Sequence, residues 1–328
     1  MNATQQHIVN GEEDISKTVL PKKQVIKASQ QEASQPRKQT DPVIHTVVRS
    51  DTSILGRRFT NPGSVRCWMN AALQLLLCGL DHMSPDIWNT LTSSLGSLLK
   101  SYRDPDEYTN TNFAMIMAEM PDNRWNDPEV FFEKISDSEC RDIKEIFMHK
   151  TWLLNTMTEC SHTSGTMSEN FTFRHLLPPP NTDMNNYLEM ASSTRDYALN
   201  DYYCEICVEA GKGQNRGATQ NSSLLNHSSD FIIYKFFITR QTFIPGDRTI
   251  NPQRIVHLKN HDGQTGMYEI IAVILFVNEN HYIAHTKQTS GIWCRCDDQN
   301  ISEISPSMVG NHPNGYPTHI LVRRCTEQ

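Results

Sequence analysis

The sequence lacks a long hydrophobic segment, a basic surplus and an apolar leader. Its longest purely apolar run, Ile270–Val277, is far shorter than the ~20 residues that a membrane-spanning helix needs. The first residues, Met1–His7, contain no apolar signal-peptide core. Lys and Arg number 30 against 37 Asp and Glu, whereas nucleic-acid-binding domains usually show a basic surplus. We therefore expect neither a membrane nor a nucleic acid as partner.

These absences also indicate the compartment and the chemistry of the thiols. Without a leader we expect the protein to be cytoplasmic, nuclear or both, where thiols stay reduced. Its nine cysteines, an odd number, are then free thiols, metal ligands or a nucleophile rather than a disulfide framework.

Residues 1–52 contain few of the residue types that form a hydrophobic core. No Phe, Trp or Tyr precedes Phe59 and no Cys precedes Cys67, while Gln, Lys, Ser and Glu dominate. Such a segment buries too little apolar surface to offset the entropy of ordering. We predict a disordered polar tail over 1–52 and a globular domain over 53–328. The basic residues of the tail are a solvated segment or a nuclear address, and both interpretations stay open.

The first part of the globular domain has the spacing of helices. Apolar residues recur at helical spacing over Met69–Leu80, which predicts one amphipathic helix. Gly79 is predicted to end this helix by adopting a left-handed backbone conformation. A second helix is predicted to start at Asp127, because Asp caps helices and the Pro-Glu that follows suits a first turn.

The later part of the domain has the composition of strands. Phe231–Ile238 and Ile270–Val277 are rich in β-branched and aromatic residues. A turn is predicted at Asn278–Asn280, followed by strands over His281–His285 and Ile292–Cys296. Helices first and antiparallel strands after them predict an α+β domain.

Cys67 stands at the start of the first predicted helix, after a turn-rich stretch. The unpaired N–H groups and the positive dipole end of a helix N-terminus favour the thiolate, which is the nucleophilic form. The competing interpretation is a buried structural cysteine.

His281 and Asp297 supply the other groups that a thiol enzyme needs. If the hairpin turns about Thr289, the two residues face each other across an antiparallel pair, with Cβ atoms ~5 Å apart. The carboxylate would then accept from one imidazole nitrogen and leave the other for a thiol, as in a Cys–His–Asp triad. The same register places His285 opposite Trp293, in a structural role. A slip of one residue would aim Asp297 at the other face.

Two further cysteines have the spacing of half a zinc site. Cys204 and Cys207 form a Cys-x-x-Cys pair, and Cys160 with His162 offers a thiolate and an imidazole about 40 residues upstream. These four residues predict a tetrahedral zinc site. A redox pair or a vestigial pair is the alternative.

In their order along the chain, these motifs resemble the ubiquitin-specific protease family of papain-like cysteine peptidases, over about Arg57–Arg324. Asn61–Gln74 resembles the family's Cys box, Asn-x-Gly-x-x-Cys-Tyr-Met-Asn-x-x-Leu-Gln. Asn280–Ala284 with Asp297-Asp298 is similar to its His box, and Asp127–Phe131 is similar to a helix motif between the boxes. Ile143–Phe147, then Cys160 and later Cys204 and Cys207, follow the order of the family's zinc-bearing fingers.

The resemblance implies a papain-like cysteine protease fold of thumb-palm-fingers architecture, with fingers over roughly residues 155–235. It implies a thiol-dependent deubiquitinase, a cysteine-type ubiquitinyl hydrolase that cleaves the isopeptide bond after the C-terminal glycine of ubiquitin. It implies that Cys67 is the nucleophile and His281 the base. Asp297 would orient the base, and Asn61 would be the oxyanion donor. Catalysis needs no cofactor, and the finger ligands would hold a structural zinc. We expect a monomer whose partners are ubiquitin or a ubiquitin-like modifier and its conjugates.

Four departures from the family pattern mark a divergent member. The stretch from Asn61 to Cys67 is one residue longer, Trp68 replaces Tyr, Asn280 replaces Gly, and the first zinc knuckle lacks its second Cys. The alternatives are an isopeptidase for a ubiquitin-like modifier such as SUMO, or a catalytically weak ubiquitin-binding pseudoenzyme. Another Cys–His–Asp enzyme, such as a transglutaminase or an acyltransferase, fits the Cys box poorly.

Overall fold

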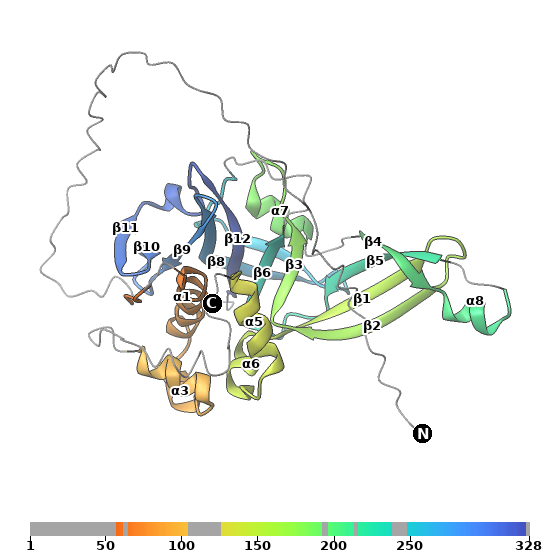
Figure 1. Cartoon of the computed structure of the whole chain (residues 1–328), viewed down its shortest axis with the longest axis horizontal. Coiled ribbons are helices and arrows are strands. Elements are labelled where there is room, and N and C mark those ends of the chain that lie inside the picture. Colours follow the sequence, from red (N-terminus) through yellow and green to blue (C-terminus); the bar gives the residue numbers. More distant parts are fainter. Residues whose placement is uncertain are drawn as a thin grey trace, which may run out of the picture. The chain divides into compact units, whose positions relative to one another are not determined.

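The computed structural model describes residues 57–61, 65–103, 126–191, 196–212, 216–237 and 248–325. All of them belong to the second of the two compact units into which the chain divides, Thr52–Gln328. The polar tail predicted over 1–52 lies outside the described residues. Within the second unit the structure is a mixture of helices and mostly antiparallel strands (Figure 1).

Helices dominate the first part of this unit. Among the described residues, the helices before the first strand are α1 (Cys67–Asp81), α2 (Ile87–Thr90), α3 (Ser94–Ser101), α5 (Pro128–Asp137) and α6 (Arg141–Phe147). Shorter ones follow among the strands: α7 (Met184–Ala191), α8 (Glu205–Glu209) and the 3-10 helix η2 (Pro306–Met308). None of the described helices is both long enough and apolar enough to cross a membrane.

The strands form two sheets. A four-stranded antiparallel sheet in the order β2-β1-β5-β4 contains β1 (His149–Met157), β2 (Thr163–Asn170), β4 (Asp196–Tyr203) and β5 (Arg216–Leu224). The larger sheet has the order β11-β10-β9-β8-β12-β6-β3, and β7 also pairs with β8. Its strands are β3 (Thr172–Leu176), β6 (Phe231–Phe237), β7 (Val256–Lys259), β8 (Thr265–Val277), β9 (His281–Lys287), β10 (Trp293–Asp297), β11 (Asn300–Ile304) and β12 (Gly315–Arg324). Only the pairing of β3 with β6 is parallel among these described strands.

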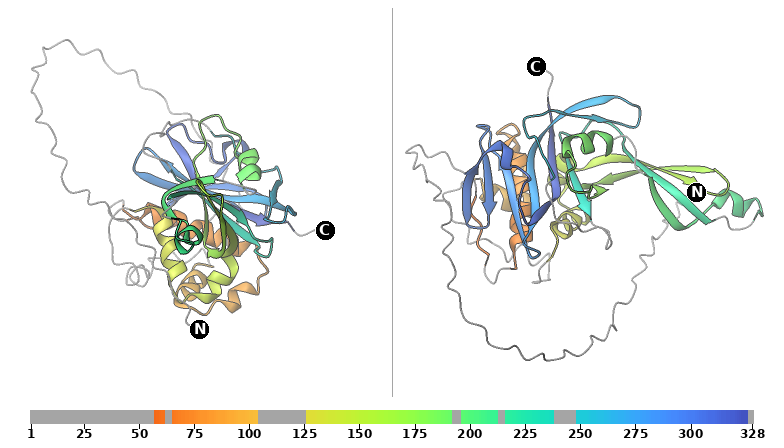
Figure 2. Two further views of the ribbon diagram at one scale, coloured as in Figure 1. Left: turned by 90° about the vertical axis from the view of Figure 1, so that its right-hand side faces the viewer. Right: turned by 90° about the horizontal axis from the view of Figure 1, so that it is seen from above.

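Buried side chains pack on both faces of the larger sheet, and the ribbon views of Figure 2 show helices beside this sheet. β8 contributes Ile271 and Ile274 to a cluster that includes α1, α5 and α6. It contributes Ile270 and Val273 to a second cluster, which includes Leu188 of α7. The long apolar run of β8 is therefore explained by a central strand that is covered on both sides.

The helix predicted from the apolar spacing is confirmed as α1, but its predicted stop is wrong. The helix continues to Asp81 and is buried along its length up to Leu80. Gly79 lies inside the helix, and a Cβ atom added there would come within 2.7 Å of the Phe147 ring. Glycine is needed here because α6 packs closely, rather than because the chain must turn.

The start predicted for the second helix is confirmed. The Asp127 side chain accepts a hydrogen bond of 2.8 Å from the backbone N–H of Glu129, and Pro128 occupies the first turn. Phe131 and Phe132 of this helix, α5, are fully buried. This cap fixes the position at which α5 begins.

The hairpin of β9 and β10 has a different register from the predicted one. Thr286 faces Cys294, and His285 faces Arg295 instead of Trp293. The cause is the loop: Gly291 adopts a left-handed φ of 88°, and the N–H of Gln288 donates to the carbonyl of Ile292. The turn is therefore centred one residue later than expected, which moves each cross-strand partner by two residues. The turn predicted at Asn278–Asn280 is confirmed, with φ of 51° and 62° at its first two residues.

Candidate active site

Cys67 is the first residue of α1 and is fully buried. Its backbone N–H lies in the first helical turn, where N–H groups have no acceptor within the helix. The residue before it is held by Asn61, whose Oδ1 accepts a hydrogen bond of 2.7 Å from the N–H of Arg66. The sulfur thus lies at the positive end of a helix that packs against β9.

His281 and Asp297 lie where β9 begins and β10 ends. Their side chains are in contact: His281 Nε2 lies 2.7 Å from Asp297 Oδ1. The register makes them diagonal rather than direct neighbours, yet an offset of two residues keeps both on one face of the sheet. The predicted contact therefore occurs although the predicted register is wrong.

The imidazole of His281 interacts with both other groups. Hydrogen bonds to Asp297 and then to the Cys67 side chain raise the pKa of His281 to about 10, so the imidazole is protonated at neutral pH. Since Nε2 is used by Asp297, Nδ1 is the nitrogen left for the sulfur. The hydrogen bond from His281 holds the pKa of Asp297 below its usual range, and Arg295 adds a second contact of 2.8 Å. This arrangement can hold a proton next to a sulfur nucleophile.

Asp298 has a role that the sequence analysis missed. Its carboxylate accepts hydrogen bonds from Asn61 Nδ2 at 2.7 Å and from Asn70 Nδ2 at 2.6 Å. Its backbone carbonyl also accepts from the N–H of Phe59, and its φ is +53°. Asp298 therefore ties the segment before α1 to the turn after β10. The doubled acid Asp297-Asp298 was the available signal, but sequence alone did not reveal the partners of the second one.

Asn61, the predicted oxyanion donor, is held in place by both ends of its amide. The oxygen accepts from Arg66, and the nitrogen donates one hydrogen to Asp298. An asparagine amide has two N–H hydrogens, and the described residues provide an acceptor for one of them.

Tyr282 connects this group to the beginning of α5. It follows His281 directly, is buried, and its hydroxyl lies 3.5 Å from Asp127 Oδ2. The other carboxylate oxygen of Asp127 accepts from Lys235 Nζ at 2.6 Å. His285, by contrast, lies deep in the sheet and accepts the N–H of Gly310 at Nδ1, which agrees with its predicted structural role.

A cavity of about 900 Å³ lies beside this connection. The N-cap residue Asp127 and Phe132 of α5 line the cavity, together with Leu153 of β1 and Ser222 of β5. Cys67 and His281 are not among its lining residues, so the cavity adjoins the site through Asp127 rather than containing it.

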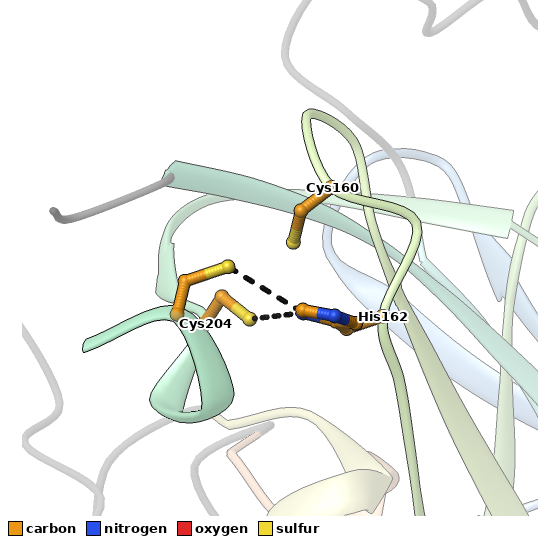
Figure 3. A group of neighbouring side chains, drawn as sticks. Cys160, His162 and Cys204 are labelled. Carbon is orange, nitrogen blue, oxygen red and sulfur yellow. Dashed lines mark hydrogen bonds between the residues drawn. The ribbon is translucent and has the colours of Figure 1, made fainter. Parts of the chain in front are cut away.

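The four predicted metal ligands come together in the structure, and Figure 3 shows three of them, Cys160, His162 and Cys204, pointing toward one another. Their ligand atoms all lie within 4.8 Å of one another. His162 Nδ1 lies 3.2 Å from Cys204 Sγ and 3.4 Å from Cys207 Sγ. Cys160 and His162 belong to the turn between β1 and β2, and the other two flank the start of α8. This group could hold a metal ion such as zinc.

The same fold occurs among solved structures. A chain of the SAGA Ubp8/Sgf11/Sus1/Sgf73 DUB module bound to ubiquitin aldehyde matches with a TM-score of 0.57 at 14% identity, covering 83% of this chain and 70% of that chain. A chain of this module with a substituted Ubp8, bound to monoubiquitin, matches with a TM-score of 0.58 at 15% identity and the same coverage. At such identities the likeness shows the fold alone. No protein-family model and no curated protein matches the sequence.

Proposed function

We propose that the protein is a cysteine isopeptidase that cleaves the bond after the C-terminal glycine of ubiquitin or a ubiquitin-like modifier. The observation that supports this most directly is the position of His281, whose Nε2 lies 2.7 Å from Asp297 Oδ1 and whose side chain also interacts with that of Cys67. The fold adds support, because two of the matching solved structures are DUB modules, one bound to ubiquitin aldehyde and one bound to monoubiquitin.

In the first half of the reaction Cys67 Sγ attacks the carbonyl carbon of the terminal glycine. The carbon–nitrogen bond to the lysine side chain breaks, and the electron pair leaves with the amine nitrogen. His281, protonated at neutral pH because its pKa is raised to about 10, gives its proton to that nitrogen. The products are a free lysine amine and a thioester on Cys67.

In the second half a water molecule replaces the amine. His281 is now neutral and removes a proton from the water, which attacks the thioester carbonyl. The carbon–sulfur bond breaks, which restores the Cys67 thiolate beside the imidazolium and releases the modifier carboxylate. Asp297 holds the imidazole in one orientation throughout, through the contact to Nε2.

The oxyanion of each tetrahedral intermediate needs hydrogen-bond donors. We propose the backbone N–H of Cys67, which lies in the first turn of α1, and the second N–H of Asn61. Asp298 would orient this second donor, because its carboxylate accepts the hydrogen bond from the first N–H of the Asn61 amide.

We also propose that the unit has the thumb-palm-fingers architecture of papain-like ubiquitin-specific proteases. The helices α1, α3, α5 and α6 would form the thumb and the larger sheet the palm. The four-stranded sheet, which extends away from the larger sheet and has α8 at its far end (Figure 1), would form the fingers. In this arrangement Cys67 belongs to the thumb and His281 to the palm.

The cluster at the far end of the fingers fits zinc. Tetrahedral zinc with Zn–S of ~2.3 Å and Zn–N of ~2.0–2.1 Å separates sulfur and nitrogen ligands by about 3.5 Å. The two nitrogen–sulfur distances of 3.2 and 3.4 Å are close to this value, and three thiolates with one imidazole are a zinc donor set. Bound zinc would fix the β1–β2 turn to α8. We expect about one zinc per chain by metal analysis, lost in Cys204→Ser and retained in Cys325→Ser, whose thiol lies outside the cluster.

Modifiers that carry a C-terminal electrophile test the proposed reaction. The full chain and its Cys67→Ala variant are incubated with ubiquitin and SUMO probes, and covalent adducts are counted by mass spectrometry. We expect an adduct that requires Cys67. Binding without any adduct would instead identify a modifier-binding pseudoenzyme, and neither binding nor adduct would refute the proposed function.

A further inference from the structure

The carboxylate of Asp297 has a basic side chain at each of its two oxygens. Oδ1 lies 2.7 Å from His281 Nε2, and Oδ2 accepts a hydrogen bond of 2.8 Å from Arg295 Nη2. When His281 is protonated, two cations therefore divide the negative charge of one carboxylate.

The strand geometry places Arg295 beside Asp297. The two residues stand two positions apart on β10, so their side chains lie on one face of the sheet. The Asp297 side chain is 25% exposed and the Arg295 side chain 37%. Solvent screens the charges of such a pair less than those of a fully exposed surface pair, so Arg295 acts on Asp297 more strongly than a surface cation would.

Two further imidazoles lie on this side of Asp297, and neither supplies a positive charge at neutral pH. His285 lies opposite Arg295 on β9, and burial, followed by the charge of Arg295, lowers the pKa of His285 to about 3. Burial and then the charge of Arg295 also lower the pKa of His312, in the segment before β12. In the described part of the chain, Arg295 is thus the only residue besides His281 that forms an ion pair with Asp297.

Two other ionisable groups face the imidazole of His281. The Cys67 side chain, at the start of α1, interacts with it directly. A carboxylate oxygen of Asp298 lies within 4.8 Å of an imidazole nitrogen, and this carboxylate accepts hydrogen bonds from two asparagine amides. Both groups are acidic, so Arg295 is the group that opposes the accumulation of negative charge around the imidazolium.

The balance of these charges decides how readily His281 gives up its proton. A free lysine amine has a pKa of about 10.4, and the pKa of His281 is raised to about 10. Proton transfer to the leaving amine becomes less favourable as the pKa of the donor rises above that of the acceptor. A carboxylate that faced the imidazolium without a second cation would hold the proton more tightly, because an opposite charge stabilises the protonated form.

We propose, on the basis of the isopeptidase function above, that Arg295 is a positioning residue for proton transfer to the leaving group. By sharing the carboxylate of Asp297, it keeps His281 acidic enough to protonate the departing lysine amine. Acylation of Cys67 by a substrate whose leaving group needs no proton should then be indifferent to Arg295.

Two substrates of one modifier separate these cases. An isopeptide with lysine releases an amine, which takes the proton of His281. A thioester with a small thiol releases a thiolate: Cys67 Sγ attacks the carbonyl carbon, the original carbon–sulfur bond breaks, and its electron pair leaves with the departing sulfur. No proton of His281 is needed in the second case. The acylation rates of both substrates are measured with the full chain under single-turnover conditions.

Arg295→Gln keeps an amide that can donate to Asp297 Oδ2 and removes the charge. We expect its acylation rate on the isopeptide to fall about three- to tenfold, while the rate on the thioester stays within about twofold. The basic limb of kcat/KM for the isopeptide should move up by about one pH unit, and the titration of His281 by NMR should move in the same direction. Arg295→Lys keeps the charge and should restore both properties.

Arg254→Gln is the matched control. The Arg254 side chain is 35% exposed, close to the value for Arg295, and it pairs with Asp183 and Glu189. None of these three residues belongs to the candidate active site. The substitution should change neither acylation rate and should leave the basic limb in place.

Two results would overturn the proposal. Equal losses on the isopeptide and the thioester would show a purely structural role. A basic limb that stays in place or moves down in Arg295→Gln would show that Arg295 orients Asp297 without limiting its charge. Arg295→Met repeats the comparison if Arg295→Gln folds poorly. If the native chain reacts with neither substrate, the isopeptidase function fails, while the direction of the His281 titration still tests the sharing of charge.

Discussion

The carboxylate of Asp298 accepts a hydrogen bond of 2.7 Å from the side chain of Asn61, although 237 positions of sequence separate them. The same carboxylate accepts a hydrogen bond from the side chain of Asn70, which lies one turn after Cys67 on α1. The segment that leads into the nucleophile is therefore held by the turn that follows Asp297. This link joins the two halves of the candidate active site without passing through its reacting atoms.

Replacing Asp298 should lower the rate without changing the nucleophile. In Asp298→Ala the Asn61 amide loses the partner that orients it, so we expect a fall in kcat of about 10- to 100-fold, less than direct loss of an oxyanion donor. Steady-state hydrolysis of a modifier–fluorophore substrate measures this. Asp262→Ala, at an exposed turn position, is the matched control, and an equal loss there would contradict the expected role.

The pH dependence should follow His281. Its pKa is raised to about 10 in the folded protein, above the ordinary value near 6.5. The stability from its contacts is therefore fully present below about pH 6.5 and is lost as the pH rises through about 10. Activity should have its basic limb near pH 10 for the same reason.

Asp297→Asn provides the check on this limb. The hydrogen bond that His281 donates to the Asp297 carboxylate is the largest cause of the raised pKa of His281. Without the carboxylate, the basic limb of kcat/KM should move to lower pH, and the His281 proton should titrate lower by NMR. An unchanged limb would show that another group sets it.

His149 should destabilise the protein in acid. Its side chain is buried, neither ring nitrogen has a hydrogen-bond partner among the described residues, and burial lowers the pKa of the imidazole to about 4. Stability should therefore fall as the pH drops from about 6.5 towards 4, by at most about 3 kcal/mol.

Substitution of His149 by an apolar ring should remove this dependence. We expect His149→Phe to gain stability relative to the native chain, and to gain more at pH 5 than at pH 7, because its ring already packs against Phe173. Urea unfolding at the two values measures the difference. His257→Phe, at an exposed position on β7, should show no such gain.

Gly79 should not tolerate alanine, although alanine is the better helix former by about 1 kcal/mol. The added Cβ would come within 2.7 Å of Phe147, and we expect a net loss of about 1–3 kcal/mol in the free energy of unfolding. A second substitution, Phe147→Leu, should recover part of the loss. Additive losses in the double variant would contradict the proposed clash.

The sequence was sufficient for features that local chemistry determines. The cap at Asp127, the helix that begins at Cys67 and the contact of His281 with Asp297 could all be predicted from spacing and residue type. The contact between His281 and Asp297 forms although the predicted register is wrong. Side chains two residues apart on a strand share one face of the sheet, so a register error of two residues keeps both side chains on that face.

The remaining features depend on elements that are distant in the sequence. The glycine at position 79 is explained by the close approach of Phe147 on another helix, which spacing along the sequence does not reveal. The partners of Asp298, Asn61 and Asn70, lie more than 200 positions earlier in the sequence. The pairing of Arg174 with Glu129 joins β3 to α5. Spacing rules do not predict such long-range pairs.

Of the described strands, β12 comes latest in the sequence, yet it lies inside the larger sheet between β8 and β6. A nascent chain thus exposes Cys67 long before it contains His281, and the sheet that supports the imidazole is incomplete until Gly315–Arg324 has emerged. A chain truncated before Gly315 would leave β8 and β6 without the strand that lies between them, and it should therefore lose the support of His281.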